Sequence, residues 1–176
     1  MITTSELQLI PSEITDLEDS LMNRAELALR LQVTIPASYP IEADAVPWFC
    51  QMLKDDPSLV GWLHFMVMRA ADRTLIGDGG FKGKPGQTGE PGLVEIGYSI
   101  VPEFRGRGYA TEVARALIDC AFSHAEVSAV AAHTGVGNVG SIKVLERARM
   151  KIVGEMEDSE DGRMWRWRLD RDEYGR

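Results

Sequence analysis

The stretch LVEIGYSIVPEFRGRGYATEVARALIDCAFS, residues 93–123, decides the fold. From Leu93 to Val101 apolar residues alternate with small or polar ones, as in a half-buried β-strand. A loop with two glycines follows, and from Ala110 to Phe122 apolar residues recur with the period of an amphipathic helix. The order strand, glycine loop, helix places the N-terminus of the helix beside the end of the strand.

The loop Arg105-Gly106-Arg107-Gly108-Tyr109-Ala110-Thr111 is suited to bind an anion. The first turn of a helix offers unpaired backbone N–H groups and the positive end of the helix dipole. Gly106 and Gly108 let this backbone approach an oxygen atom closely, and Arg105 and Arg107 add positive charge. The loop therefore predicts a phosphate or pyrophosphate site, with a purely structural glycine turn as the alternative.

Two nucleotide-binding motifs fit the same loop less well. The third glycine of a G-x-G-x-x-G dinucleotide fingerprint is replaced by Thr111, and the loop follows the fourth expected strand instead of the first. A P-loop requires Gly-Lys-Ser or Gly-Lys-Thr, which the sequence lacks. A dehydrogenase that uses these glycines remains a weaker hypothesis, which NADH binding would reveal.

The rest of the chain predicts one α+β domain, residues 1–176. Glycines and prolines make Gly83 to Gly92 a loop, and Asp161-Gly162 is the expected turn of a last hairpin. The expected strands are 5–10, 62–69, 75–77, 93–101, 127–133, 152–155 and 164–169. The expected helices are two pieces from Ser12 to Leu31, then 46–53, 110–122 and 138–148.

Composition places the chain among ordinary globular proteins, since 44% of its 176 residues are hydrophobic and 26% are charged. The two cysteines, Cys50 and Cys120, have no Cys or His neighbour at metal spacing, so neither a disulfide framework nor a metal site is expected. No secretory signal and no apolar run of about 20 residues is visible. We expect a cytoplasmic protein without a membrane partner.

The net charge of -8 is unevenly distributed. Residues 102–151 carry seven basic and five acidic groups, whereas residues 1–62 carry three basic and ten acidic groups. The first segment is suited to a polyanion. The second disfavours nucleic acid and tolerates a cationic substrate, although a solvated acidic surface explains most of these charges equally well.

Two motifs resemble the GNAT superfamily of N-acetyltransferases. Residues 105–110 match its R/Q-x-x-G-x-G/A signature, and Val94 to Ile100 is similar to the strand that precedes it. Asn138-Val139-Gly140-Ser141, with the residues up to Gly154, resembles the N-x-x-S helix and following strand of the branch that includes ribosomal-protein N-acetyltransferases. The resemblance implies a mixed, largely antiparallel sheet flanked by helices, in which strands 93–101 and 127–133 splay apart.

The same resemblance implies acetyl-CoA as the cofactor and direct attack of an amine on its thioester. The pyrophosphate would lie on Arg105, Gly106, Arg107, Gly108, Tyr109, Ala110 and Thr111. The pantetheine arm would follow Tyr98, Ser99, Ile100 and Val101 like an added strand. Asn138 and Ser141 would face the thioester.

Direct attack requires a group that accepts the amine proton and a donor for the leaving thiolate. Glu95 is the candidate base, because it shares a strand face with Gly97 and Ser99, which leave room for a substrate. Ser141 is the candidate donor, since Leu145 occupies the position where many family members have a tyrosine. A surface glutamate and a first-turn serine that satisfies backbone groups are the structural alternatives.

The acceptor is left open between a peptide N-terminus and a small-molecule amine, and a homodimer is also an open expectation. His133, at the end of a strand, either lines the acceptor cleft or is structural; Glu112 is either a second site carboxylate or a helix-dipole partner. The alternative function is a non-catalytic acyl-CoA-binding or interaction module, which the absent tyrosine at Leu145 favours.

Overall fold

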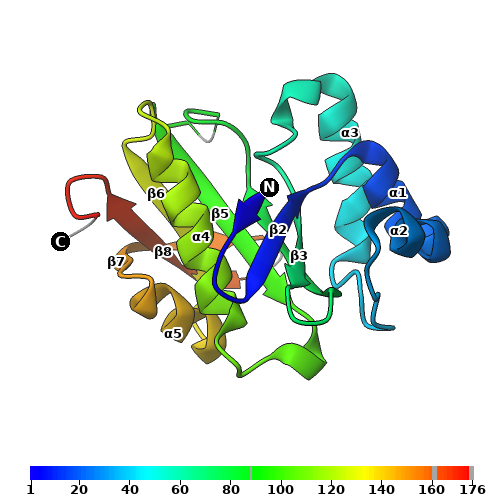
Figure 1. The fold of residues 1–176 in the computed structure, drawn as a ribbon. Helices are drawn as coiled ribbons and strands as arrows, with labels where there is room; N and C mark the ends of the chain where they lie inside the picture. Colours follow the sequence, from blue (N-terminus) through cyan, green and yellow to red (C-terminus); the bar gives the residue numbers. More distant parts are fainter. Residues whose placement is uncertain (88, 160–161, 175–176) are drawn as a thin grey trace.

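The computed structural model describes residues 1–87, 89–159 and 162–174. Within them one eight-stranded sheet runs in the order β1-β2-β3-β4-β5-β6-β8-β7 (Figure 1). Every neighbouring pair is antiparallel except β5 and β6, which are parallel. The strands are β1 (Ile2–Thr3), β2 (Leu7–Pro11), β3 (Phe65–Arg69), β4 (Thr74–Phe81), β5 (Leu93–Ile100), β6 (Ala129–Gly135), β7 (Lys151–Asp158) and β8 (Gly162–Asp170).

The helices fall into two groups around this sheet. In Figure 1, α4 lies across the central strands with α5 next to it, while α1, α2 and α3 gather beside β2 and β3. The helices are α1 (Ile14–Met22), α2 (Arg24–Leu31), α3 (Val46–Asp55), α4 (Tyr109–Ser123) and α5 (Val139–Arg147).

The sheet splits between β5 and β6. These strands pair at only three positions, Leu93 with Ala129, Val94 with Val130, and Glu95 with Ala131. Beyond Glu95, β5 continues beside β4 and β6 continues beside β8, so a V-shaped gap opens. The mixed, largely antiparallel sheet and its splay between 93–101 and 127–133 confirm the predicted fold class.

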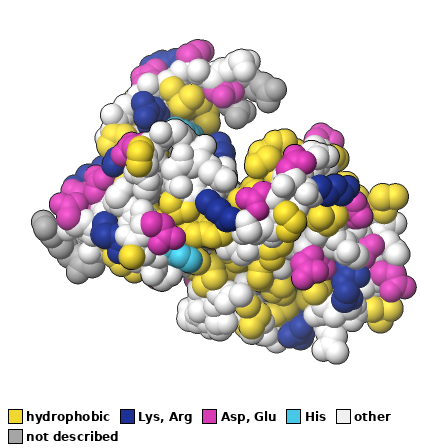
Figure 2. Space-filling view, turned by 90° about the horizontal axis from the view of Figure 1, so that it is seen from above, with side chains coloured by type: hydrophobic (Ala, Val, Ile, Leu, Met, Phe, Trp, Pro, Cys, Tyr) yellow, Lys and Arg dark blue, Asp and Glu magenta, His cyan; other side chains and the backbone are white. Residues whose placement is uncertain are grey.

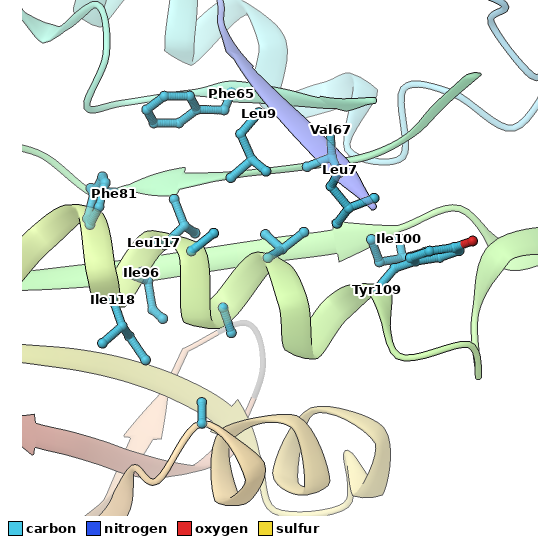
Figure 3. Close-up of a cluster of buried hydrophobic side chains, with 14 of the residues drawn as sticks. Leu7, Leu9, Phe65, Val67, Phe81, Ile96, Ile100, Tyr109, Leu117 and Ile118 are labelled. Carbon is cyan, nitrogen blue, oxygen red and sulfur yellow. The ribbon is translucent and has the colours of Figure 1, made fainter. Parts of the chain in front are cut away.

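The main core lies between the sheet and α4. Leu117 and Ile118 of α4, Ile96 and Ile100 of β5, and Leu7 and Leu9 of β2 belong to one buried cluster, in which Ile100 lies beside the ring of Tyr109 (Figure 3). The helix approaches the sheet closely because β4 has glycine where a side chain would intervene: a Cβ on Gly79 would lie 3.0 Å from Cγ1 of Val113. The apolar residues that recur with the 3.6-residue period of α4 are thus the residues that contact the sheet.

The prediction for β4 was too short. Residues 75–77 were expected to be a strand, but the strand runs from Thr74 to Phe81 and is buried throughout. Its glycines, which look like strand breakers in the sequence, are needed for close contact: a Cβ on Gly77 would lie 2.0 Å from the Ser99 carbonyl oxygen, and one on Gly80 2.3 Å from that of Leu63.

Other differences are smaller. The third strand begins at Phe65 instead of Trp62, β7 is longer than residues 152–155, and the short β1 was not predicted. Of the expected turn Asp161-Gly162, Asp161 lies outside the described residues, and Gly162 has a φ of +70°, as a tight turn requires.

Candidate active site

A cavity of about 740 Å³ occupies the V between β5 and β6 and extends over β4 toward α3. Seen from above, the molecule is deeply notched between two lobes, with apolar side chains on both walls of the notch (Figure 2). Strands β4, β5 and β6, the first turn of α5 and the segment 39–49 all contribute lining residues. The cavity therefore lies where the predicted pantetheine strand would end.

The floor of the cavity on the α3 side is built from alternate residues of β4 and β5. Asp78 is paired with Ser99 and Gly80 with Gly97, and opposite residues of antiparallel strands share a face. Glu95 follows on the same face, two residues from Gly97. A Cβ on Gly97 would meet no atom within 4 Å, so this part of the floor is open.

Glu95 is buried and held by two cationic or ionisable partners. Its Oε1 lies 2.6 Å from Nζ of Lys82 and 2.9 Å from Nδ1 of His133 on β6. Burial raises the pKa of Glu95, but the hydrogen bonds from His133 and Lys82 outweigh burial and hold this pKa below its usual range. The carboxylate is therefore ionised at neutral pH and fixed at the apex of the V.

Asp78 is a second buried carboxylate of the cavity, and the sequence prediction missed it. The Tyr39 hydroxyl donates a hydrogen bond of 2.6 Å to Asp78 Oδ1, and Nε2 of His64 lies 3.6 Å from the same oxygen. Burial raises the pKa of Asp78 to about 7, and Glu42 adds to this effect, while the hydrogen bond from Tyr39 opposes it. Burial lowers the pKa of His64 to about 4, so this histidine is neutral beside Asp78.

Asp78 makes stability depend on pH, and Asp78→Asn tests this. The pKa is about 7 in the folded chain and about 3.8 unfolded, so ionising Asp78 costs stability between pH 4 and 7. Three pKa units correspond to roughly 4 kcal/mol. We expect the Asp78→Asn variant to have a free energy of unfolding higher than wild type by up to about this amount at pH 8 and little changed at pH 4, measured by urea unfolding. Equal differences at both pH values would contradict the assignment.

The opposite wall of the V carries polar side chains from the start of α5. Asn138 caps α5, and its side-chain oxygen accepts a hydrogen bond of 3.0 Å from the Ser141 backbone N–H. Because Asn138 caps the helix, the Ser141 hydroxyl is not needed as a helix cap. Ser141, Asn138 and Tyr98 line the same cavity, and Leu145 one turn further is fully buried.

The loop before α4 has the geometry that anion binding requires. Gly106 and Gly108 adopt φ angles of +74° and +93°, and a Cβ on either would meet no protein atom within 4 Å. Among the described residues, none accepts a hydrogen bond from the backbone N–H groups of residues 106–110. Open space above unpaired N–H groups at a helix N-terminus fits a pyrophosphate.

The arginines of this loop are partly committed to the protein. Nε of Arg105 donates to the Ile100 carbonyl at 2.8 Å, and Nη2 of Arg107 donates to the Glu103 carbonyl at 3.1 Å. A second cavity, of about 490 Å³, lies beside the loop and is lined by Arg107, Arg115 and Arg147. The last two were not predicted; their spacing on separate helices gives no sequence signal.

The predicted pantetheine strand is available in part. The Val101 N–H donates to the Ile76 carbonyl, and the Lys82 N–H donates to the Glu95 carbonyl. Because backbone groups alternate in direction along a strand, residues 95, 97, 99 and 101 turn theirs toward β4. The backbone groups of Tyr98 and Ile100 consequently face the V. The side chains of Ile100, Val101, Tyr109 and Thr111 are buried in the protein, so these residues could contact a cofactor only through their main chain.

Two remaining sequence hypotheses are clarified. Glu112 Oε1 accepts hydrogen bonds from the hydroxyls of Thr4 and Ser5 and from the Glu6 N–H, which anchors the first hairpin away from the larger cavity. His133 lines that cavity and contacts Glu95. Arg149, the second residue after α5, has a φ of +64°, a left-handed conformation that glycine most often adopts at the end of a helix.

Comparison with known proteins identifies the family. The model of the family described as "Acetyltransferase (GNAT) domain" matches residues 6–151, so the chain belongs to the GNAT acetyltransferases. Acetyl-CoA is the cofactor of this family. The uncharacterized N-acetyltransferase YjdG of Bacillus subtilis is 32% identical over 104 residues, which are 59% of this chain and 60% of that relative.

Solved structures share the fold at low sequence identity. One is RimL, a ribosomal L7/L12 α-N-protein acetyltransferase in complex with coenzyme A, with a TM-score of 0.68, 16% identity and 97% of both chains covered. Another is a chimera of spermidine N-acetyltransferase SpeG from Vibrio cholerae and hSSAT, with a TM-score of 0.69, 16% identity, and 97% and 98% covered. Among the helices of the described residues, none is both long and apolar enough to cross a bilayer.

Proposed function

We propose that this chain transfers the acetyl group of acetyl-CoA to a primary amine by direct attack. The observation that carries the proposal is the V between β5 and β6, which joins an anion cradle at one end to a buried, ionised carboxylate at its apex. When bound, acetyl-CoA supplies a thioester that a neutral amine can attack. The chain supplies the positions of both reactants and the route for the proton.

The cradle residues hold the cofactor in this proposal. Backbone N–H groups from Gly106 to Ala110 bind the pyrophosphate, with Arg105 and Arg107 beside them and Thr111 closing the first helical turn. The backbone of Tyr98 and the N–H of Ile100 pair with the pantetheine arm, flanked by Ser99 and Val101, while the Ile100 carbonyl accepts from Arg105. Asn138 orients the first turn of α5 so that Ser141 faces the V.

Glu95 accepts the amine proton, directly or through one water molecule. Its carboxylate is ionised at neutral pH, and the open floor at Gly97 gives an amine room beside it. His133 and Lys82 fix the carboxylate in place. Because its pKa lies below the usual range, Glu95 is a weak base, and its main effect is to lower the cost of losing a proton from a bound ammonium.

Ser141 donates a hydrogen bond to the departing sulfur. Its hydroxyl is not required as the cap of α5, because Asn138 fills that role. Leu145 offers no donor. Ser141 therefore supplies polar contact at the end of the V where the sulfur would lie.

The acceptor is proposed to be an amine on a peptide N-terminus or a small molecule. Asp78, Glu42 and Glu95 line the acceptor side of the cavity together with the rings of Trp48 and Phe49. Carboxylates and aromatic faces both favour a cation, which a protonated amine is before it reacts. The neighbours of similar fold named above act on a ribosomal protein and on spermidine, so the fold alone does not choose between these classes.

Two measurements in sequence test the proposal. Calorimetric titration with acetyl-CoA is expected to give one site, and NADH is expected not to bind. Release of free thiol is then followed with a panel of amines: dipeptides with free N-termini, diamines, polyamines and aminoglycosides. Turnover with one class identifies the acceptor; binding without turnover by any amine would favour a non-catalytic acyl-CoA-binding module, and absence of binding would refute the proposal.

A further inference from the structure

The hydroxyl of Tyr98 is a buried polar group without a hydrogen-bond partner among the described residues. The pairing of β5 with β6 ends at Glu95, and Tyr98 lies three residues further along β5. It is opposite Gly79, whose missing side chain would point at Val113 and Leu117 of α4, so the Tyr98 ring lies on the α4 side of the sheet. A buried hydroxyl without a partner is unfavourable and calls for an explanation.

The surroundings of this hydroxyl point to a ligand. Tyr98 of β5 and Asn138 and Ser141 at the start of α5 line the same cavity. Burial raises the pKa of Tyr98 to about 12, and the Ser141 hydroxyl opposes this effect from a position close to the Tyr98 hydroxyl but outside hydrogen-bond geometry. Both can donate to one atom placed between them in the V, since the Tyr98 hydroxyl has no hydrogen-bond partner among the described residues and the cap of α5 is made by Asn138.

We propose that the Tyr98 hydroxyl, together with Ser141, donates a hydrogen bond to the sulfur of the thiol that leaves in the acetyl transfer. This inference rests on the proposed function and names a second donor for the same sulfur. In the step, the amine nitrogen forms a bond to the acetyl carbon and the carbon–sulfur bond breaks, with its electron pair going to sulfur. The amine proton passes to Glu95 and then to water, so the products are amide, thiolate and a proton in solution.

The pKa values decide how Tyr98 acts. A thiol has a pKa near 8.5 in water, whereas that of Tyr98 is about 12. Proton transfer from this tyrosine to a thiolate is therefore uphill by more than three pKa units. Tyr98 keeps its proton and stabilises negative charge on sulfur as a hydrogen-bond donor, in the way that fixed donors stabilise developing charge at other active sites.

The test measures the thiol of bound coenzyme A, independently of turnover. The absorbance of the thiolate near 240 nm is followed from pH 6 to 10 in wild type and in Tyr98→Phe, and the same titration with desulfo-coenzyme A is subtracted to remove protein signals. Cys50 and Cys120 interfere little, because burial raises the pKa of both thiols. A hydrogen bond to a charged group is expected to lower the pKa of the bound thiol by about one to two units in wild type.

In Tyr98→Phe we expect most of this shift to be lost while coenzyme A still binds. The free variant should also melt about 2–6 °C higher than wild type, since it no longer buries an unpaired hydroxyl. Tyr39→Phe is the matched control: the Tyr39 hydroxyl donates to Asp78, so this variant should melt lower and leave the pKa of the bound thiol unchanged. Ser141→Ala should remove the remaining part of the shift.

Each outcome decides the inference. Coenzyme A that binds wild type with an unshifted thiol pKa would overturn it without any variant, as would equal shifts in wild type and Tyr98→Phe. In both cases the proposed acetyl transfer would stand, because the cofactor is bound. Failure of wild type to bind coenzyme A would instead refute the proposed function together with this inference.

Discussion

Glu95→Gln is expected to lower kcat/KM for the best acceptor amine by about 100-fold or more near pH 7, the range typical of a lost general base. Glutamine keeps the shape of the side chain and can accept the hydrogen bonds of Lys82 and His133, so the fold should change little. Above the pKa of the amine itself the acceptor is already neutral, and the difference between variant and wild type should shrink. The measurement is the pH profile of kcat/KM for both proteins.

Two controls accompany the Glu95 prediction. Glu90→Gln removes a carboxylate that pairs with Arg168 on the surface, and it should leave the profile unchanged. His133→Gln tests positioning: if His133 only orients Glu95, kcat should fall less than in Glu95→Gln and the shape of the profile should persist. A profile of Glu95→Gln that parallels wild type at every pH would remove Glu95 from the base role.

Gly108→Val is expected to weaken acetyl-CoA binding by at least about 100-fold. The added side chain would occupy the open space above the loop and block the N–H groups from a pyrophosphate. Loss of two hydrogen bonds to a charged group is worth roughly 3–6 kcal/mol, which corresponds to this factor or more. Titration calorimetry with acetyl-CoA measures the effect.

Strain must be separated from steric blocking in this experiment. A β-branched residue at the Gly108 φ of +93° also costs about 1–3 kcal/mol of stability. Gly61→Val places the same side chain at a φ of +86°, also with no atom within 4 Å, at a residue that lines neither cavity. The two variants should lose similar stability, and only Gly108→Val should lose affinity; equal affinities would remove the cradle from the proposal.

The sequence predicted the fold where one period or one motif controlled the local structure. The strand and helix around residues 93–123 were recognised because alternation and the 3.6-residue pattern each extend over several turns or pairs. Residues 74–81 were underestimated because glycine has two opposite meanings in a strand. It breaks a strand in isolation, but here Gly77 and Gly80 allow backbone to pack where a Cβ would collide.

The candidate site was predictable only as far as it is local in sequence. The loop at residues 105–111 is one such stretch, and Glu95 was found because its neighbours on the strand are small. Asp78 could not be found, since its significance arises from burial against Tyr39 and His64, which come from distant parts of the chain. A charged residue among the glycines of residues 76–80 was the single available signal.

The short pairing of β5 with β6 also affects how the protein behaves in solution. Beyond the three paired positions the edges of β5 and β6 face each other across the V without pairing, much like the outer edges that make β-proteins prone to self-association. A ligand that lies along β5 would act as a missing strand and close this seam. By mass action it would also stabilise the folded chain, so resistance to aggregation during storage should increase with the concentration of the cofactor.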